Sequence, residues 1–318
     1  MKAVCIHQFG DADVLQVEDL PRPEPAAGEV LIEVRAASVN PVDYKIREGR
    51  YPAVRADQLP VILGRDVAGM VAGLGAGVTR FERGDEVFAM LPPDRGGYVE
   101  WVTAPADVCA RKPRRLDMIQ AASVPLAALT AWQGLFTYGR LEAGQKVLIH
   151  GASGGVGPFA VQFAALTGAE VYATAAGDAR DLVESLGAHR VIDYHTEAFE
   201  EIVNDIDLVY DLIGGATERR SWQVLRRGGC FISTVQEPDP DKILETGVMA
   251  CRYTARADGD QLRRIAALID EGKVRVIIDR VFPLEEAAAA ERHLEKDHVT
   301  GKVVLDVAGP WGTPPCRT

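Results

Sequence analysis

A glycine-rich segment near the middle of the chain has the residue types and spacing of a phosphate-binding turn. It consists of Gly151, Ala152, Ser153, Gly154, Gly155, Val156 and Gly157, and it follows an apolar run that ends at His150. Glycines let backbone N–H groups approach a pyrophosphate closely, and a helix N-terminus supplies partial positive charge. The segment therefore predicts a dinucleotide-binding turn, provided that a strand precedes it and a helix follows it.

The elements that must position this turn are visible on both sides of it. Residues 146–150 form a short apolar strand segment. Beyond the turn, apolar residues recur with the period of a helix that buries one face, at Val156, Phe159, Ala160, Phe163 and Ala164. Pro158 falls in the first helical turn, where its missing N–H costs little. This order of elements favours cofactor binding over a turn in which the glycines are only structural.

The second half of the chain alternates between strand-type and helix-type segments. We expect strands at 146–151, 170–175, 189–194, 208–213, 229–234 and 248–253, with helices at 121–136, 179–187, 220–228 and 259–272. Apolar strands separated by helices are typical of a parallel sheet covered on both faces. The pattern predicts a doubly wound α/β domain over residues 123–273.

The first part of the chain has a different texture. Short β-rich segments at 3–9, 29–39, 66–74, 85–91 and 97–104 are separated by Gly and Pro, which is typical of a mostly antiparallel β domain. After the doubly wound region, strands are expected at 274–283 and 302–307 with a helix at 284–296 between them. We therefore predict a first domain formed by residues 1–122 and completed by 274–318, whose last residues, from Gly309, are expected to be loop.

Composition and charge exclude several classes of function. The chain has 318 residues, 47% of them hydrophobic and 25% charged, as in an ordinary globular protein of about two domains. Its net charge of −11 argues against broad binding to nucleic acid or to an anionic membrane. No apolar run approaches the roughly 18 residues that a membrane span needs. Residues 1–10 lack a signal-peptide core and are expected to form a strand.

The cysteines indicate a reducing compartment. There are five, at positions 5, 109, 230, 251 and 316, with no closely spaced pair. An odd number of distant cysteines predicts free thiols and excludes a disulfide framework or a cysteine zinc lobe. Cys230 and Cys251 lie in apolar runs and are expected to be inert core thiols. We expect a cytoplasmic protein.

Four motifs, in this order, resemble the medium-chain dehydrogenase/reductase superfamily. They are Ser38 to Arg47 (SVNPVDYKIR), Gly64 to Gly69 (GRDVAG), the glycine-rich turn, and the ending Gly301-Lys302-Val-Val-Leu. The resemblance runs from Met1 to about Val307 and is greatest to the zinc-independent quinone oxidoreductase and enone reductase branch. It implies a GroES-like, mostly β catalytic domain followed by a Rossmann nucleotide-binding domain.

The chain departs from the zinc-dependent members of this superfamily at the metal ligands. Those enzymes carry a cysteine ligand near residue 38 and a Gly-His-Glu where this chain has Gly64-Arg65-Asp66. A guanidinium stays protonated and cannot bind a metal, and no cluster of soft ligands is present. Without a Lewis acid to ionise an alcohol, reduction of an already activated acceptor is the expected chemistry, with no metal.

The sequence favours NADPH over NADH. NAD-specific folds carry an acidic residue at the end of the second strand, but that strand here ends at Thr174 and Ala175 without a carboxylate. Arg180 follows within reach of a 2′-phosphate, and Tyr194 resembles a 2′-phosphate contact in relatives that use NADPH. Arg180 could equally be a solvated charge on a helix face, and Asp178 weakens the case.

The resemblance implies further cofactor contacts. Asn40 and Thr130 would lie near the nicotinamide. Ile213 and Gly214 would form one loop over the ribose and carboxamide, and Ser233, Thr234 and Val235 the other. Lys302 would approach the phosphates. The alternatives are a turn asparagine, a capping threonine and a surface lysine.

The expected chemistry needs few residues. A hydride passes from the nicotinamide to a quinone or to the β-carbon of an enone, and the charge that builds on the acceptor oxygen needs hydrogen-bond donors and a proton. Tyr51 matches a tyrosine that related reductases place facing the nicotinamide, and Asn40 lies near it. Tyr51 packing under a Pro-rich loop is the alternative, and water could supply the proton. Arg47 is expected to form a structural ion pair with Asp43 or Asp66.

Two other functions remain open at this stage. An enoyl-thioester reductase would need an acyl channel and a basic patch for a carrier, which the acidic charge disfavours. A nucleotide-binding protein with little catalysis could act as a redox-responsive or structural partner. In either case we expect a homodimer that pairs through the edge strand at 248–253, because an apolar edge strand left open favours aggregation.

Overall fold

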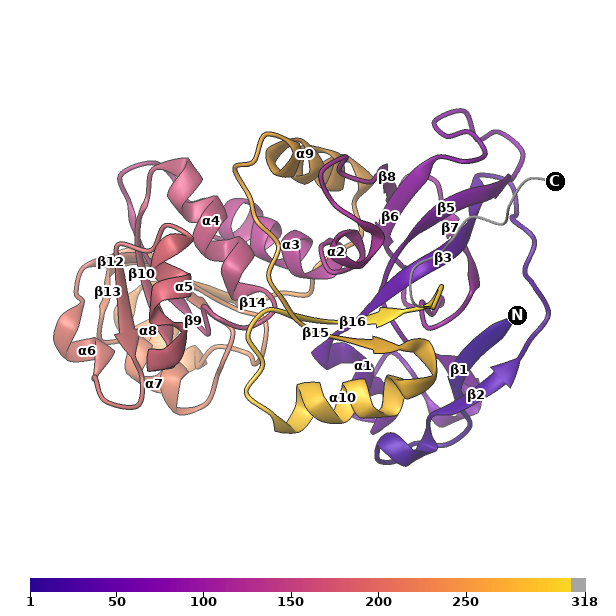
Figure 1. Cartoon of the computed structure of the whole chain (residues 1–318). Coiled ribbons are helices and arrows are strands. Elements are labelled where there is room, and N and C mark those ends of the chain that lie inside the picture. The colour runs from indigo at the N-terminus through magenta and orange to yellow at the C-terminus, as the bar shows by residue number, and fades with distance from the viewer. Residues whose placement is uncertain (310–318) are drawn as a thin grey trace. The chain divides into compact units, whose positions relative to one another are not determined.

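The computed structural model describes residues 1–309, so Cys316 and most of the predicted C-terminal loop lie outside the described residues. Two compact units can be distinguished by their internal contacts (Figure 1). Of the described residues, the first contains Met1–Leu126, Ala257–Asp270 and 278–309, and the second contains Ala127–Arg256 and Glu271–Ile277. Within residues 1–309, no helix is long and apolar enough to cross a membrane.

The second unit is built on a six-stranded parallel sheet. Its strands are β9 (Lys146–His150), β10 (Glu170–Ala175), β11 (Arg190–Asp193), β12 (Ile206–Asp211), β13 (Leu225–Ser233) and β14 (Met249–Arg252). Their order is β11-β10-β9-β12-β13-β14, and every neighbouring pair is parallel. The strand order reverses between β9 and β12, which is the switch point at which doubly wound sheets bind ligands. The predicted α/β fold class is confirmed.

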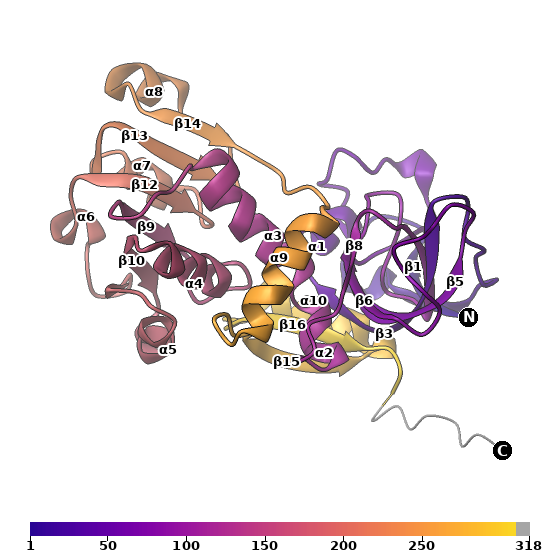
Figure 2. The same ribbon diagram turned by 90° about the horizontal axis from the view of Figure 1, so that it is seen from above.

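Helices lead into or connect these strands, and several of them pack on the sheet (Figure 2). They are α3 (Pro125–Trp132), which continues as a π-helix (Gln133–Tyr138), then α4 (Gly157–Thr167), α5 (Arg180–Ser185), α6 (Phe199–Ile202), α7 (Ala216–Ser221) and α8 (Pro240–Thr246). The apolar stripe predicted for α4 understates its burial, because every residue from Gly157 to Ala164 is buried. The helix ends at Gly168, whose φ of 84° is a left-handed conformation that glycine adopts easily.

The prediction of a helix at residues 220–228 is wrong. In the structure α7 ends at Ser221, and β13 already begins at Leu225. The backbone after the helix is used by the sheet, because Leu225 pairs with Ile206 and the N–H of Ile206 donates to Val224 at 2.9 Å. Trp222 is buried in an apolar cluster at this turn, so its side chain marks a connection rather than a helix face.

The first unit contains two sheets. A three-stranded antiparallel sheet has the order β2-β1-β4, from β1 (Lys2–Ile6), β2 (Gln16–Asp19) and β4 (Val61–Ile62). The larger sheet has the order β15-β16-β3-β5-β6-β8, with β7 paired to β3. Its strands are β3 (Glu29–Val39), β5 (Asp66–Leu74), β6 (Glu86–Met90), β7 (Trp101–Pro105), β8 (Cys109–Arg111), β15 (Ile278–Pro283) and β16 (Lys302–Asp306). This unit is the predicted, mostly antiparallel β domain.

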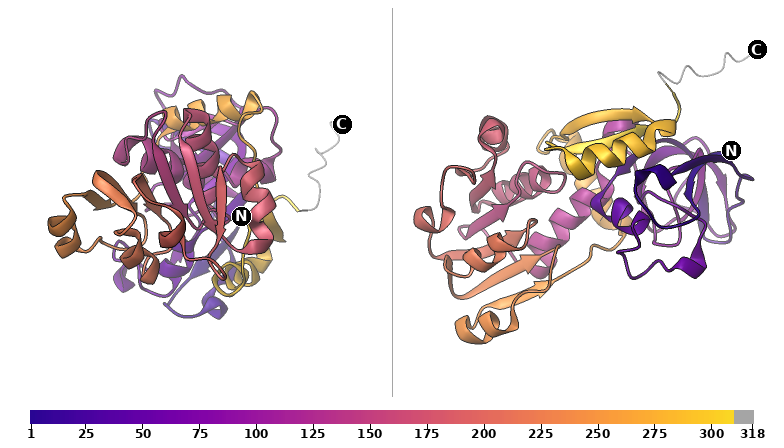
Figure 3. Two further views of the ribbon diagram at one scale, coloured as in Figure 1. Left: turned by 90° about the vertical axis from the view of Figure 1, so that its left-hand side faces the viewer. Right: turned by 90° about the horizontal axis from the view of Figure 1, so that it is seen from below.

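The C-terminal part of the chain returns to the first unit. Strand β16 pairs antiparallel with β3, with Val303 opposite Val39, so the start of β16 lies at the end of β3. Helix α10 (Ala287–Lys296) packs on β15 and β16, as the right-hand view of Figure 3 shows, and also on α1 (Pro41–Arg47). This return places Lys302 beside the residues that follow β3.

Helix α9 (Gly259–Asp270) also belongs to the first unit, although the sequence analysis placed it in the nucleotide-binding domain. The N–H of Gly259 donates to Asp107 at 3.0 Å. A Cβ at Gly259 would come within 2.4 Å of that carbonyl oxygen, so only glycine allows this close approach to the chain before β8. The short helix α2 (Met118–Ala122) precedes α3. The domain boundaries at 122 and 273 stay a prediction.

The four described cysteines are free thiols. Burial raises the pKa of Cys5 and Cys230 to about 11 and that of Cys109 to about 12, which makes these three unreactive. Cys251 differs from the expectation of a core thiol, because it is only partly buried on the outermost strand β14.

Candidate functional site

The glycine-rich turn joins β9 to α4 in the second unit, as predicted. Gly151 has a φ of 74°, and a Cβ at Gly157 would lie 2.4 Å from the carbonyl oxygens of Gly151 and Ala152. These two glycines are therefore required by the backbone itself. At Gly154 the nearest atom to a Cβ is the Gly151 oxygen, 3.6 Å away, so the space beside this residue is open.

This turn fits the pyrophosphate of a dinucleotide. It leads into the N-terminus of α4, an 11-residue helix with a proline in its first turn. The backbone dipoles of such a helix favour an anion at that end. Ala152 and Ser153 are buried, and the N–H of Ala152 donates to Thr174 at 3.0 Å, which fixes the turn against β10. Gly155 and Val156 complete the turn before the helix begins.

Four buried polar residues form one row across the sheet at this end. Thr174 lies opposite His150, His150 opposite Asp211, and Asp211 opposite Ser233. The predicted cofactor residues Thr174 and Ser233 are thus brought together with two side chains whose partners the sequence did not reveal.

His150 is held in this row as a neutral side chain. Its Nδ1 lies 3.0 Å from the Thr174 hydroxyl and its Nε2 3.0 Å from the Ser221 hydroxyl. Ser221 donates its own hydrogen to Thr217, so it accepts from Nε2–H, and Nδ1 accepts from Thr174. Burial lowers the pKa of His150 to about 3. The side chain is structural, and its partners are hydroxyl groups rather than backbone groups.

Asp211 organises the two loops that the sequence assigned to the cofactor. Its Oδ1 accepts hydrogen bonds from the N–H groups of Ile213 at 3.0 Å and Gly214 at 2.9 Å. Its Oδ2 accepts from the Ser233 hydroxyl at 3.3 Å, and that hydroxyl accepts from the Val235 N–H at 3.1 Å. Thr234 is tied to the same residue, because its N–H donates to the Asp211 carbonyl at 3.3 Å. Burial raises the pKa of Asp211. An acidic residue that ends a buried strand was the available signal for it.

The structure gives Arg180 structural partners. Its guanidinium donates to the Val191 carbonyl and to Glu197, each at 2.8 Å. Tyr194 is 46% exposed, whereas Thr174 and Ala175 are buried. A Cβ at Gly177 would lie 2.6 Å from the carboxylate of Asp193. The end of β10 therefore has a carboxylate beside it that the sequence of β10 alone does not show.

Thr130 lies buried on α3, and its carbonyl is held by two tyrosines. Tyr253 donates to it at 2.6 Å, and the Tyr210 hydroxyl lies 3.0 Å from it. The two hydroxyl oxygens are 2.5 Å apart. A Cβ at Gly134, in the π-helix, would come within 2.5 Å of the Tyr253 oxygen, so glycine makes room for this cluster. The tyrosines were not foreseen, because they lie 80 and 123 residues beyond Thr130 in the chain.

In the first unit, Asn40 and Lys302 are brought into direct contact. The ammonium group of Lys302 donates to the carboxamide oxygen of Asn40 and to the Val39 carbonyl, the latter at 3.3 Å. Both side chains are buried. We predicted that Lys302 would approach the phosphates. In the structure its contacts lie within this unit, because the pairing of β16 with β3 places it in the interior.

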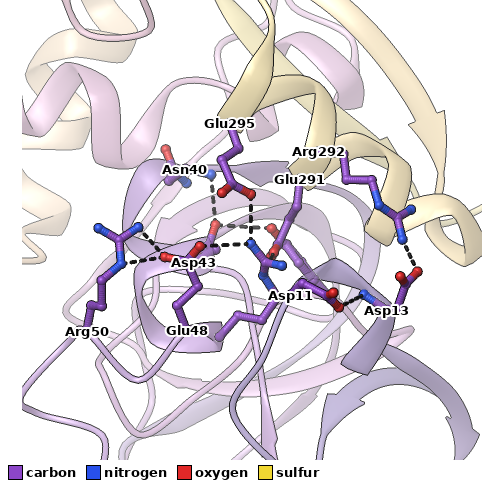
Figure 4. Close-up of polar contacts among 11 residues, drawn as sticks. Asp11, Asp13, Asn40, Asp43, Glu48, Arg50, Glu291, Arg292 and Glu295 are labelled. Carbon is purple, nitrogen blue, oxygen red and sulfur yellow. Dashed lines mark hydrogen bonds and ion pairs between the residues drawn. The ribbon is translucent and has the colours of Figure 1, made fainter.

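Acidic side chains are buried beside this pair. Asp43 Oδ2 accepts hydrogen bonds from the Asn40 N–H at 2.8 Å and from the Tyr98 hydroxyl at 3.1 Å, while its Oδ1 has no hydrogen-bond partner within residues 1–309. Figure 4 shows Asp43 of α1 and Glu291 of α10 on facing elements. Burial raises the pKa of Asp43 to about 7 and that of Glu291 to about 8. The negative charge of Asp66 adds to the rise in the pKa of Asp43, and that of Asp43 adds to the rise in the pKa of Glu291.

The ion pair predicted for Arg47 has other partners than expected. Its Nε lies 2.8 Å from Glu291 without good hydrogen-bond alignment, and its Nη2 donates to Glu295 at 2.9 Å. Asp43 and Asp66 are not its partners among the ion pairs of residues 1–309. The choice follows from the packing of α10 on α1, which the spacing of residues along the chain does not reveal.

Tyr51 is partly buried against an apolar cluster that includes Val39 and Ile46. The packing that the sequence offered as its alternative role is therefore present. Within residues 1–309, this packing leaves the Tyr51 hydroxyl without a hydrogen bond.

Comparisons with known proteins show the family. A family described as "Alcohol dehydrogenase GroES-like domain" matches residues 26–114, and one described as "Zinc-binding dehydrogenase" matches residues 186–305. The chain is 35% identical to the mouse (Mus musculus) "NAD(P)H oxidoreductase RTN4IP1, mitochondrial" over 96% of this chain and 89% of that protein. It is 35% identical to the "NADPH-dependent alkenal/one oxidoreductase, chloroplastic" of Arabidopsis thaliana, over 96% and 79%. The chain belongs to the medium-chain dehydrogenase/reductase superfamily.

Solved structures narrow this assignment. The quinone oxidoreductase of Coxiella burnetii superposes with a TM-score of 0.91 at 36% identity, over 96% of this chain and 99% of that one. The Escherichia coli quinone oxidoreductase complexed with NADPH gives a TM-score of 0.87 at 28% identity, over 96% and 100%. A segment of the Mycobacterium tuberculosis "Mycocerosic acid synthase-like polyketide synthase", 15% of that protein, is 35% identical over 94% of this chain. This medium-chain reductase is an oxidoreductase of the quinone and alkenal/one type, as the motifs predicted.

The residues of this medium-chain reductase do not fit a zinc site. Arg65, at the position of a zinc-ligating histidine in metal-dependent members, is buried, and its Nε donates to the Leu91 carbonyl at 2.9 Å. Across residues 1–309, no group of three or more His, Cys, Asp or Glu side chains is arranged to hold a metal ion. The guanidinium therefore fills a position where zinc chemistry needs a neutral donor.

Proposed function

We propose that this medium-chain reductase uses NADPH to reduce quinones or the C=C bond of α,β-unsaturated carbonyl compounds, without a metal. The observation that carries the proposal is the turn between β9 and α4. Its backbone requires glycine at positions 151 and 157, while the space beside Gly154 is left open at the N-terminus of a buried helix. That combination suits a pyrophosphate and has no evident structural purpose at Gly154.

Bound NADPH would supply the hydride, and the chain's own residues would bind, orient and stabilise. The turn would hold the pyrophosphate, and the loops tied together by Asp211 would cover the nicotinamide end. Negative charge develops on the acceptor oxygen as the hydride arrives, so a hydrogen-bond donor lowers the barrier. Tyr51 is our candidate for that donor, and Asn40, the N-cap residue of α1, is expected beside the nicotinamide. A phenol with a reference pKa of about 10 keeps its proton at neutral pH.

Support for NADPH over NADH comes from two directions. Strand β10 ends without a carboxylate of its own, and the half-exposed Tyr194 follows β11. The Arabidopsis relative is named as NADPH-dependent, and the Escherichia coli relative was solved with NADPH. The carboxylate of Asp193 beside Gly177 acts against a 2′-phosphate, so we propose a preference rather than exclusive use.

An enoyl-thioester reductase is the second candidate, and the similarity to a segment of a polyketide synthase favours it. A nucleotide-binding protein with little catalysis is the third. We also propose a cytoplasmic homodimer that pairs through β14, the outermost strand of its sheet, where Met249 is 58% exposed and Leu244 in α8 is 83% exposed. A molecular mass corresponding to a monomer, measured by light scattering at micromolar concentration, would contradict the proposed dimer.

The proposal can be tested in two stages. Fluorescence titration of the purified protein with NADPH and NADH tests the cofactor, and we expect both to bind with NADPH the tighter. Comparison of kcat/KM for 1,4-benzoquinone, a 2-alkenal, a vinyl ketone and crotonyl-CoA then ranks the substrates. Preference for crotonyl-CoA would select the enoyl-thioester reductase, and tight NADPH binding without turnover would select the binding protein.

A further inference from the structure

A buried polar cluster in the first unit centres on Asp66, a residue to which the sequence analysis gave no part in catalysis or cofactor binding. Asp66 is fully buried at the start of β5. Its Oδ2 accepts hydrogen bonds from the Ser38 hydroxyl at 2.7 Å and from the Asn40 carboxamide at 3.0 Å. Its Oδ1 accepts from the N–H of Leu126 at 2.7 Å. One carboxylate thus joins the end of β3, the start of α1 and the start of α3.

The contact with Leu126 caps a helix from a distant part of the chain. Helix α3 begins at Pro125, so the Leu126 N–H is one of the donors that a helix cannot satisfy internally. A carboxylate in this position also interacts favourably with the helix dipole. Thr130, the expected nicotinamide contact, lies about one turn further along the same helix. Asp66 therefore fixes the first turn of the helix that carries Thr130.

The carboxamide of Asn40 is saturated by the protein. Its two N–H groups donate to Asp66 and to the Ser38 carbonyl, the latter at 3.3 Å, and its oxygen accepts from Lys302. Lys302 has three donors: one goes to Asn40, one to the Val39 carbonyl, and the ammonium lies 3.7 Å from Asp66. Asn40 has no N–H left for a substrate, and the Lys302 ammonium is held within the cluster by two hydrogen bonds and one ion pair.

Lys302 and Asp66 carry opposite charges in this cluster, and Asp43 is a second buried acid beside them. Lys302 and Asp66 are 4% and 0% exposed, so each charge would be costly alone, and removal of either partner leaves the other unpaired in the interior. The contacts also fix orientation, because reversing the Asn40 amide would place its N–H groups against the Lys302 ammonium. Lys302 and Asp66 thus have two effects that experiments can distinguish: they neutralise each other's charge, and they fix the orientation of the Asn40 carboxamide.

We propose that Lys302 and Asp66 are positioning residues that hold the Asn40 carboxamide and the first turn of α3, and that Lys302 is not a phosphate ligand. The inference rests on the proposed function only in that Asn40 and Thr130 are the expected neighbours of the nicotinamide. Asn40 then contributes through its fixed position beside the reacting groups, and does not donate a hydrogen bond to the oxygen of the substrate.

Four variants of the full-length protein test this assignment: Lys302→Met, Asp66→Asn, the double variant of the two, and Lys273→Met as control. Lys273 is an exposed lysine that pairs with Glu271, each 53% exposed, so its removal tests loss of a lysine without loss of the cluster. The measurements are the Kd for NADPH, kcat and KM, the melting temperature, and amide hydrogen exchange of peptides that cover residues 39–46 and 125–132.

Lys302→Met should lower kcat about tenfold through misplaced groups, while the Kd for NADPH changes less than about twofold. Asp66→Asn should speed exchange in the peptide that contains Leu126 by at least about tenfold, and the control should change neither quantity. The double variant removes both charges, so its melting temperature should recover toward the wild-type value while kcat stays low. A purely structural pair would recover both.

Two results would overturn the assignment. A tenfold or greater rise in the Kd for NADPH with unchanged kcat in Lys302→Met would make the lysine a phosphate ligand. Unchanged exchange at residues 125–132 together with unchanged kcat in Asp66→Asn would contradict the positioning role, because the asparagine amide has one acceptor oxygen and cannot keep the contacts to both Leu126 and Asn40. If the wild-type protein reduces no quinone or enone, the proposed function fails, but the exchange and binding measurements still decide this inference.

Discussion

Arg180 donates one hydrogen bond to the Val191 carbonyl and one to Glu197, both at 2.8 Å. Glu197 also accepts the N–H of Asp193 at 2.9 Å, so the three groups tie the start of α5 to the end of β11. A 2′-phosphate would have to compete with Glu197 for this guanidinium. The residue that the sequence offered for cofactor specificity therefore supports the strand end in this structure, and its contact with a 2′-phosphate stays a prediction.

Arg180→Ala should consequently lower stability more than cofactor selectivity. We expect a loss of about 1 kcal/mol in the free energy of unfolding, at the low end for charged hydrogen bonds because the side chain is 38% exposed. The ratio of Kd values for NADH and NADPH should change less than about threefold. Arg190→Ala, which removes a longer contact of 3.5 Å to the same Glu197, is the control. A selective tenfold loss of NADPH affinity would restore Arg180 to the cofactor site.

Gly154→Asp should abolish cofactor binding without unfolding the protein. The open space beside Gly154 accepts a side chain, but a carboxylate there would lie beside the pyrophosphate. We expect the Kd for NADPH to rise by at least about a hundredfold through like-charge repulsion. Gly154→Ala is the matched control, because a Cβ lies 3.6 Å from its nearest neighbour and brings no charge. Unchanged affinity in the aspartate variant would mean that the pyrophosphate binds elsewhere.

Tyr51→Phe should lower turnover and spare cofactor binding. Loss of one donor to the developing oxyanion typically costs about ten- to a thousandfold in kcat. The aromatic packing against the cluster around Val39 is kept, so the melting temperature should not change. Tyr44→Phe, a partly buried tyrosine on α1, serves as the comparison. An unaltered rate in the Tyr51 variant would assign the proton to water or to another group.

The buried acids predict a stability that falls as pH rises. Burial raises the pKa of Glu291 to about 8 and of Asp43 to about 7, above the reference values of 4.5 and 3.8. The folded state then holds protons that the unfolded state releases, so their contribution is fully present below about pH 4 and is lost through pH 7 to 8. Asp66, Tyr98 and Lys302 face Asp43, and Arg47, Glu48 and Glu295 face Glu291.

Glu291→Gln imitates the protonated form and should flatten part of this decline. At pH 8 we expect the variant to be as stable as the wild type or more stable, by an amount on the order of 1 kcal/mol, and at pH 4 the two should coincide. Arg47 keeps Glu295 as a partner at 2.9 Å. Chemical denaturation at a series of pH values measures this, with the exposed Glu286→Gln as control. An unaltered pH profile in Glu291→Gln would show that Glu291 is ionised throughout.

Much of the fold could be predicted from local patterns in the sequence. The strands at 29–39, 66–74 and 170–175 begin and end where the alternation and the flanking glycines and prolines predict. The helix predicted at 220–228 is wrong because Trp222 and Val224 are buried in a turn that leads directly into β13, and the spacing of apolar residues does not distinguish such a turn from a helix. Helix α9 was recognised as a helix, but its partner β8 lies about 150 residues earlier and left no trace in its own sequence.

The site divides in the same way. The glycine turn is a local feature, so its residues could be predicted from their order alone. Asp66, Asp211, Tyr210 and Tyr253 were missed, because each matters through a partner that the fold supplies. Lys302 was assigned by resemblance to the phosphates, and only the pairing of β16 with β3 reveals that its ammonium is used within its own unit.

Metal-independent reduction by NADPH is tested most directly by following the loss of reduced-nicotinamide absorbance with 1,4-benzoquinone, 9,10-phenanthrenequinone, a 2-alkenal and a vinyl ketone, with and without a chelator. We predict turnover of at least one quinone or enone, at a rate that the chelator does not change. Activity abolished by the chelator and restored by zinc would contradict the metal-free chemistry. Tight binding of NADPH without turnover of any of these substrates would contradict the assignment as a reductase of quinones and enones.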